Sequence, residues 1–157
     1  MRALGALTSG LALLTGAALA APVAVIEVSD GHGRFVAPLD DGEEFTYSYI
    51  QSIYGVTVVE EQRRVGDRLR IIRVRSTDIK AVEYFRWESP IRDEGAEHVQ
   101  DAPSYEVPQL LIRITPPSAQ RIATPRWALD LPGRFGDAVV TVRPETLPRA
   151  MVLWLSR

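Results

Sequence analysis

The 157-residue sequence contains no cysteine and two histidines. The lack of cysteine excludes disulfides, thiol catalysis and the cysteine-borne lipid anchor of bacterial lipoproteins, so packing alone must stabilise the fold. The histidines and their acidic neighbours match no metal-ligand spacing, so we expect neither a metal nor a cofactor. After residue 21 no apolar run approaches the length of a membrane span, and we expect that part to be water-soluble.

An excess of positive charge is also lacking, since the formal net charge is −2. Nucleic-acid binding requires a basic surface, and we therefore expect no nucleic-acid partner.

The first twenty residues have the three-part pattern of a secretory signal peptide. Arg2 precedes an apolar run that ends in the small-residue exit Ala18-Leu19-Ala20. We place cleavage after Ala20, because a cut one residue later would put Pro22 directly after the scissile bond. The sequence thus predicts a signal peptide over 1–20 and a periplasmic domain over 21–157. The alternative is an uncleaved segment that anchors the domain to the inner membrane.

Short stretches of alternating apolar and polar residues follow, separated by turns rich in glycine, proline and aspartate. The expected strands are 23–28, 34–39, 43–52, 56–65, 68–75, 80–87, 109–115, 121–131, 138–143 and 150–155. Helical spacing is not sustained anywhere, and no internal repeat is present. We therefore predict a single all-β domain, either an antiparallel β-sandwich or a small partly open barrel, with a polar surface loop at about 88–107.

Two strands carry further information. In 43–52, Phe45, Tyr47 and Tyr49 share one face. In 68–75 the apolar face changes phase between Ile71 and Ile72. Because side chains in a strand alternate with period two, this slip predicts a bulge or a bend where a strand crosses between sheets.

Residues 45–61 read Phe-Thr-Tyr-Ser-Tyr-Ile-Gln-Ser-Ile-Tyr-Gly-Val-Thr-Val-Val-Glu-Glu. This segment resembles the hallmark of the domain-of-unknown-function 1850 (DUF1850) family, small exported proteins often encoded beside TRAP-type transporters of the TAXI class. The family's serine corresponds to Ser52 and its acidic pair to Glu60 and Glu61. Its histidine is replaced here by Gln51, and its proline position holds Thr57 or Val58. The resemblance implies a compartment and a neighbouring transporter, not a reaction.

The candidate ligand- or partner-binding residues lie on neighbouring expected strands. They are Tyr49, Gln51, Ser52, Glu60, Glu61, Arg73 and Arg75. Glu60 and Glu61 must point to opposite faces, so only one of them can join a shared polar site. The structural alternative is that Ser52 caps the turn while one glutamate pairs with Arg73 or Arg75, an ordinary cross-strand stabilisation.

A basic hairpin and three tryptophans each allow two interpretations. The arginines at 63, 64, 68, 70, 73 and 75 either hold an anionic ligand or form a solvated face balanced by Glu60, Glu61 and Glu83. We predict that Trp87, Trp127 and Trp154 belong to the core rather than to a sugar-binding platform.

We conclude from the sequence that the chain is a non-enzymatic periplasmic accessory or binding protein of a TRAP-type solute transporter. Its expected partner is the permease or the solute-binding protein. One alternative is a free-standing module that binds a small ligand or a carbohydrate. Another is a hydrolase that uses Glu60 or Glu61 with Ser52, although no catalytic motif such as Gly-x-Ser-x-Gly is present.

Overall fold

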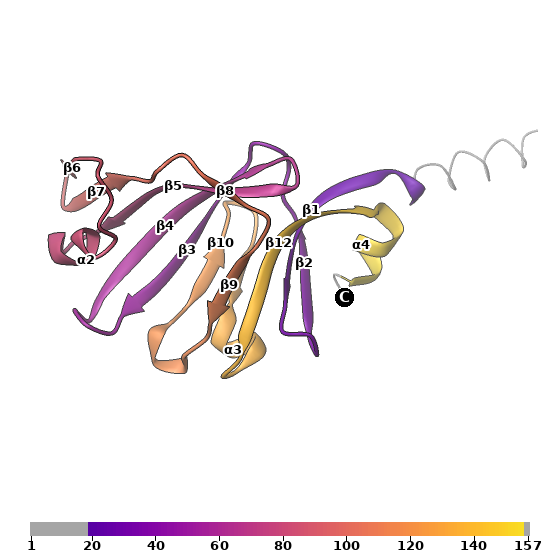
Figure 1. The fold of residues 1–157 in the computed structure, drawn as a ribbon. Helices are drawn as coiled ribbons and strands as arrows, with labels where there is room; N and C mark the ends of the chain where they lie inside the picture. The colour runs from indigo at the N-terminus through magenta and orange to yellow at the C-terminus, as the bar shows by residue number, and fades with distance from the viewer. Residues whose placement is uncertain (1–18, 156–157) are drawn as a thin grey trace, which may run out of the picture.

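The computed structural model describes residues 19–155, which fold into two mainly antiparallel β-sheets (Figure 1). The sheets pack against each other as a sandwich, and over the described residues neither closes into a barrel. The predicted all-β class is therefore confirmed. The predicted signal peptide falls almost entirely on residues 1–18, which lie outside the described part of the chain.

The smaller sheet has the strand order β2-β1-β12-β9. Its strands are β1 (Pro22–Ser29), β2 (Arg34–Pro38), β9 (Leu110–Arg113) and β12 (Val139–Pro148). Strand β1 pairs along its whole length with β12, although about 115 residues of sequence separate them. In this order β9 is an edge strand, which matters for the site described below.

The larger sheet has the order β11-β10-β3-β4-β5-β7-β6, with β8 pairing to β5. Its strands are β3 (Glu44–Gln51), β4 (Val56–Val65), β5 (Arg68–Ser76), β6 (Ile91–Glu94), β7 (Glu97–Asp101), β8 (Glu106–Val107), β10 (Arg121–Ala123) and β11 (Ala128–Asp130). We call the face that points toward the smaller sheet its inner face.

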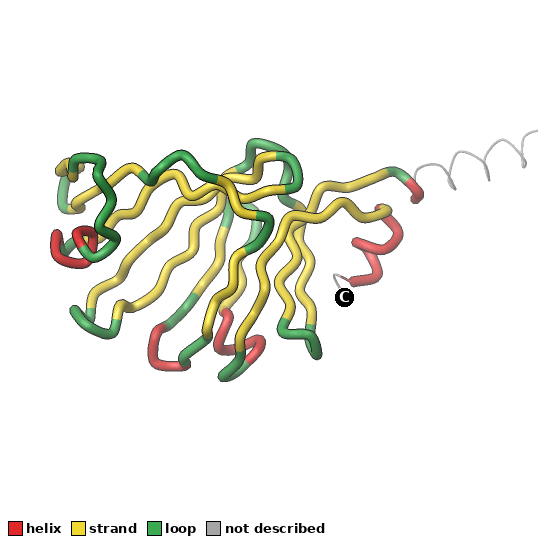
Figure 2. The backbone as a smooth tube through the Cα atoms, viewed as in Figure 1, coloured by secondary structure: helices red, strands yellow, loops and turns green. Residues whose placement is uncertain are grey.

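Short helices lie at strand ends, as the red segments of Figure 2 show. They are α2 (Ile79–Glu83), the 3-10 helix η1 (Pro116–Ser118), α3 (Leu131–Phe135) and α4 (Arg149–Leu155). In Figure 1, α2 and α4 lie at opposite ends of the molecule. Within residues 19–155, no helix has the length and apolar character needed to cross a membrane.

The main core fills the space between the two sheets. It includes Ile26 and Val28 from β1, Val140 and Val142 from β12, Phe45 from β3 and Leu69 from β5. A smaller cluster of Val25, Val36 and Val152 holds α4 against the smaller sheet. A third cluster of Val58, Val74, Ala81 and Val82 lies under α2 at the far end of the larger sheet. The inner face of β3 and β4 therefore runs from the main core to the cluster under α2.

The predicted slip in the fifth strand is confirmed as a bulge. Glu61 pairs with Arg73 but Gln62 pairs with Ile71, so Ile72 is the extra residue. As a result Leu69 and Val74 are both buried on the inner face, although they are five positions apart and would point to opposite faces of a regular strand.

Four element predictions are wrong. The expected strand 121–131 is a hairpin of the short strands β10 and β11, and its last residue begins α3. The expected strand 80–87 begins instead with helix α2, whose five residues are too few to show a helical period. The expected strand 150–155 is instead part of helix α4. This helix packs on the smaller sheet through its buried residue Val152. The expected loop 88–107 contains the strands β6, β7 and β8. These strands have few apolar residues, and ion pairs such as Arg75–Glu97 and Arg92–Asp101 link their side chains.

The tryptophans do not all behave as predicted. Trp127 packs beside Phe35 at the main core, and Trp87 packs beside Phe85 at the cluster under α2. Trp154 is 72% exposed on α4, so its predicted core position is wrong.

Candidate functional site

An open cleft lies where the smaller sheet ends and the inner face of β3 and β4 is left uncovered. Two adjoining hollows of about 460 and about 260 Å³ share Tyr47 and Tyr49. Glu60 and Gln62 of β4 line the smaller hollow together with edge strand β9. The larger hollow is completed by Gln51, Ser52, Ile53, Tyr84, Thr115, Ser118 and Gln120, among others. We call the two hollows together the tyrosine cleft.

The strand register places the polar groups of the cleft side by side. Tyr47 pairs directly with Glu60, and Phe45 pairs with Gln62, so these side chains share the inner face. Tyr49 follows two residues after Tyr47 on the same face, and its ring centroid lies 5.0 Å from that of Tyr47. Because side chains alternate between the two faces of a strand, the Glu60 carboxylate and the Gln62 amide lie on the same face as the rings of Tyr47 and Tyr49.

Glu60 carries an unusual carboxyl group. Burial in this apolar surrounding raises its pKa to about 7, and hydrogen bonding to the side chains of Tyr49 and Gln62 offsets part of the rise. The Gln62 amide donates through Nε2 to Glu60 Oε2 at 3.4 Å. Glu60 makes no ion pair with any residue between 19 and 155. It is thus a partly buried acid without a counter-ion from the described chain.

The two tyrosines stay neutral at physiological pH. Burial raises the pKa of Tyr47 to about 12 and moves the pKa of Tyr49 well above its ordinary value. The Tyr47 hydroxyl accepts a hydrogen bond from Gln120 Nε2 at 2.8 Å. Gln120 also donates to the Arg113 carbonyl of β9, so it ties the cleft floor to the edge strand. Both phenols can therefore serve as hydrogen-bonding groups and as ring surfaces for a ligand.

Two amide oxygens in the cleft lack hydrogen-bond donors. Gln62 is 1% exposed, and its Oε1 has no partner among the described residues. Gln51 is also buried, and its Oε1 is likewise unpaired within that part of the chain. A buried acceptor without a donor costs about 1 to 3 kcal/mol. Both oxygens belong to residues that line the cleft, although the two atoms themselves are shielded from solvent.

The structure brings together some of the predicted site residues and separates others. Tyr49, Gln51 and Glu60 line the cleft, and Ser52 lies exposed at its rim in the turn before β4. That turn is closed by a backbone hydrogen bond from Gly55 to Gln51 at 2.8 Å. The side chain of Ser52 therefore belongs to the mouth of the cleft and not to its floor.

Glu61, Arg73 and Arg75 do not line the cleft that contains Glu60. The Glu61 carboxylate lies on the opposite face, where it binds Arg73 Nε at 2.7 Å and Arg75 Nε at 3.1 Å. The period of two in β4 is the reason, as the sequence predicted for the two glutamates. The stabilising cross-strand interpretation is therefore confirmed for these three residues.

The cleft residues that the sequence reasoning missed include three whose side chains make its hydrogen bonds or share its strand face. Tyr47 and Gln62 occupy the same alternating face as Tyr49 and Glu60, and that alternation was a sufficient signal. Gln120 lies 73 positions after Tyr47, and no local pattern connects the two.

The basic hairpin is not a free cationic surface. Arg63 pairs with Glu44, Arg68 and Arg70 with Glu106, and Arg75 with Glu61 and Glu97. Arg64 is buried and donates to backbone carbonyls. The expected balance by Glu60 and Glu83 is wrong, because Glu60 points to the inner face and other carboxylates supply the pairs.

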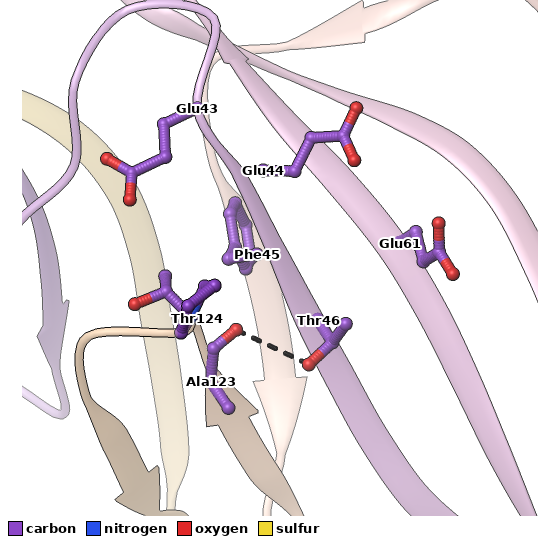
Figure 3. A pocket seen from close by; sticks show the side chains of 8 residues that line it. Glu43, Glu44, Phe45, Thr46, Glu61, Ala123 and Thr124 are labelled. Carbon is purple, nitrogen blue, oxygen red and sulfur yellow. Dashed lines mark hydrogen bonds between the residues drawn. The ribbon is translucent and has the colours of Figure 1, made fainter.

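A larger hollow of about 550 Å³ lies elsewhere, near Phe45, Thr46, Ala123 and Thr124 (Figure 3). Figure 3 shows Glu43 on one side of it and Glu44 and Glu61 on the other. Each of these carboxylates is already paired with an arginine: Arg126, Arg63 and Arg73 respectively. Because its charged groups are satisfied within the chain, this hollow is a weaker candidate than the tyrosine cleft.

No cluster that could hold a metal ion, with three or more histidine or acidic side chains, occurs in residues 19–155. His98 lies 2.6 Å from Asp93 as an isolated pair.

Comparison of the chain with models of known families, with curated proteins and with solved structures gave no match. The resemblance to the DUF1850 family stays a prediction, and the functional assignment rests on the geometry of the tyrosine cleft.

Proposed function

We propose that this chain is a non-enzymatic binding protein that works outside the cytoplasm as an accessory of a TRAP-type solute transporter. Its ligand occupies the tyrosine cleft. The observation that carries the proposal is the buried, unpartnered oxygen of Gln62 beside the unpaired Glu60 carboxylate in an open cleft. Export and a transporter partner are supported by the sequence pattern of 1–20 and by the resemblance in 45–61.

The cleft is suited to binding because a rigid scaffold presents its polar groups. Tyr47, Tyr49, Glu60 and Gln62 project from two paired strands of the larger sheet. Small-molecule sites are mostly apolar concavities with a few placed polar groups, and this cleft has that composition. Polar groups left unsatisfied in a stable fold are most simply explained by a ligand that completes their hydrogen bonds.

A glutamate-dependent hydrolase has less support. Among the described residues that line the two hollows, Glu60 is the one carboxylate. Glycoside hydrolysis ordinarily requires a second carboxyl group at a defined distance across the substrate. Glu61 lies on the opposite face, and Ser52 lies in an exposed turn.

Ligand binding is tested by thermal denaturation of the full chain in the presence of small molecules extracted from the periplasm of the producing bacterium. A ligand that binds only the folded state raises Tm, because it adds a stabilisation of RT ln(1 + [L]/Kd). We expect the extract to raise Tm of the parent protein and not of Tyr49→Ala. Tyr105→Ala is the matched control, since Tyr105 is exposed and does not line the cleft. Equal stabilisation of both variants would contradict the assigned site.

The transporter partner is tested by affinity purification of the tagged full chain from lightly cross-linked cells. We expect a transporter permease or a solute-binding protein to co-purify. If neither is recovered while the extract still raises Tm, the transporter role is wrong and the chain is a free-standing binding module.

A further inference from the structure

We infer that the ligand of the tyrosine cleft is an organic cation, bound by a primary ammonium or guanidinium group between Glu60, the Gln62 amide oxygen and the rings of Tyr47 and Tyr49. This inference rests on the proposed function and deepens it by naming the chemical class of the ligand.

Charge balance is the first argument. Other carboxylates of the larger sheet, such as Glu44, Glu61 and Glu106, each pair with an arginine. Glu60 is partly buried and has no cationic partner among residues 19–155. Arg113 is the arginine that lines the same hollow, but it binds Asp137 at 2.6 Å and is largely exposed. A buried charge requires a counter-charge, and a cationic ligand can supply it.

The direction of the missing hydrogen bonds is the second argument. An ionised carboxylate only accepts hydrogen bonds, so the Gln62 amide turns Nε2 toward Glu60 and leaves Oε1 as a buried, unpaired acceptor. An ammonium group has three donors and a guanidinium group has five. Either can donate to Glu60, and to Gln62 as well once its side chain rotates to expose the buried Oε1. A fully ionised carboxylate or phosphate group would supply no donor and would be repelled by ionised Glu60.

The aromatic and apolar walls are the third argument. The rings of Tyr47 and Tyr49 lie 5.0 Å apart with an interplanar angle of 31°. Cations bind favourably over the faces of such rings. Leu110 and Ile112 of β9 line the same hollow and offer an apolar surface for the carbon chain that bears the cation. Tyr84 is 55% exposed and stands at the mouth of the other hollow.

Binding of a cation is expected to depend on pH through Glu60. The other titratable or charged groups that line the same hollow as Glu60 are Tyr47 and Tyr49 from β3 and Arg113 from β9, and Tyr84 after α2 lies near Tyr49 in the adjoining hollow. The pKa values of Tyr47 and Tyr49 are raised, so these groups stay protonated near neutrality. The pKa of Glu60 is raised to about 7, so its carboxyl group must lose a proton before it attracts a cation. Affinity should fall about tenfold per pH unit below that value.

The test uses the full chain and four probes of one size: n-butylammonium, n-butylguanidinium, 1-butanol and butyrate. The ¹³C resonance of the Glu60 carboxyl group is followed by NMR against pH, with and without each probe. We expect the two cations to lower the Glu60 pKa by about one unit or more and to shift the Gln62 side-chain amide resonances. Butanol and butyrate should do neither. Calorimetry at pH 6 in two buffers should detect release of about 0.4 proton per bound cation if the pKa falls by one unit, and up to about 0.9 if it falls much further.

Variants of neighbouring residues provide the matched control. Glu60→Gln keeps the shape of the side chain and should weaken binding of n-butylammonium by about tenfold or more. Glu61→Gln removes a carboxylate from the opposite face and should leave cation binding unchanged. Tm of each unliganded variant shows that it is folded.

Failure of this inference is distinguishable from failure of the proposed function. If the extract raises Tm through Tyr49 while the cations leave Glu60 unperturbed, the cleft binds a ligand of another class and the inference is overturned. If Glu60→Gln binds n-butylammonium as tightly as the parent, it is overturned as well. If neither extract nor probes bind in the cleft, the proposed function falls with it.

Discussion

Arg64 joins the two sheets through its buried guanidinium group. Its Nη1 donates to the carbonyls of Val25, Leu39 and Glu145 at 2.8, 3.1 and 3.0 Å, and its Nε donates to Gly66 at 2.8 Å. These carbonyls come from β1, from the segment after β2, from β12 and from the β4–β5 turn. One side chain thus donates to backbone carbonyls from both sheets.

Replacing Arg64 with alanine should lower the free energy of unfolding by about 3 kcal/mol, because it leaves several buried carbonyls without donors. The control is Arg63→Ala, since Arg63 is exposed and pairs with the exposed Glu44. That variant should lose less than about 1 kcal/mol. Urea denaturation measures both values, and equal losses would contradict a structural role for Arg64.

Glu60 gives the stability of the protein a distinct pH dependence. Its pKa is raised from the ordinary value of 4.5 to about 7 in the folded state. The folded protein therefore holds more protons than the unfolded chain between these values, and stability falls as pH rises through them. The loss is on the order of 3 kcal/mol by pH 8.

Glu60→Gln should therefore be more stable than the parent at pH 8 and nearly equal to it at pH 4. The comparison is made by urea denaturation across this pH range. Glu61→Gln should keep the parental fall in stability, because the slope originates from Glu60. A parental slope in Glu60→Gln would refute the assignment of the raised pKa to this residue.

At the scale of elements, helix α2 depends on a single cap and a small buried face. The Asp78 side chain accepts a hydrogen bond from the Lys80 backbone at 2.9 Å. Ala81 and Val82 are fully buried against Val58 and Val74. Because α2 has five residues, it depends on these tertiary contacts rather than on its own helical propensity.

Asp78→Ala should cost about 1 kcal/mol in unfolding free energy, whereas Asp78→Ser should retain most of the stability because serine is also an effective N-cap. Chemical denaturation measures both. If the two substitutions were equally damaging, the capping hydrogen bond would not be the stabilising contact.

On the scale of the whole molecule, the two ends of the larger sheet are stabilised unequally. The main core beneath β3 and β5 is covered by the smaller sheet. Beyond the cleft, β6 and β7 are held by the four-residue cluster under α2 and by ion pairs that are largely exposed. Surface ion pairs contribute little stability, so this end should open first.

Native-state hydrogen exchange should therefore show that the amides of β6 and β7 exchange through openings of lower free energy than those of β1 and β12. A ligand that fills the tyrosine cleft should slow exchange in β3 and β4. A single opening free energy for all strands would mean that the two cores unfold as one unit.

Much of the fold could be predicted from local patterns. The alternation of apolar residues located β1 to β5 to within one or two residues, and the phase change at Ile72 located the bulge. The same alternation separated Glu60 from Glu61. It failed at α2 and α4, because one or two helical turns do not establish a period, and at β6 to β8, because polar strands lack an apolar face.

The sequence by itself determined the strand faces, since side-chain direction in a strand follows from a period of two and needs no partner. It therefore placed Tyr49 and Glu60 among the candidates. Only the tertiary structure decided that edge strand β9 lines the cleft beside β4, that Gln120 meets Tyr47, and that Glu60 lacks an ion pair within the described chain. These features arise from packing between segments far apart in sequence, and no local pattern encodes which strands meet or where a sheet ends.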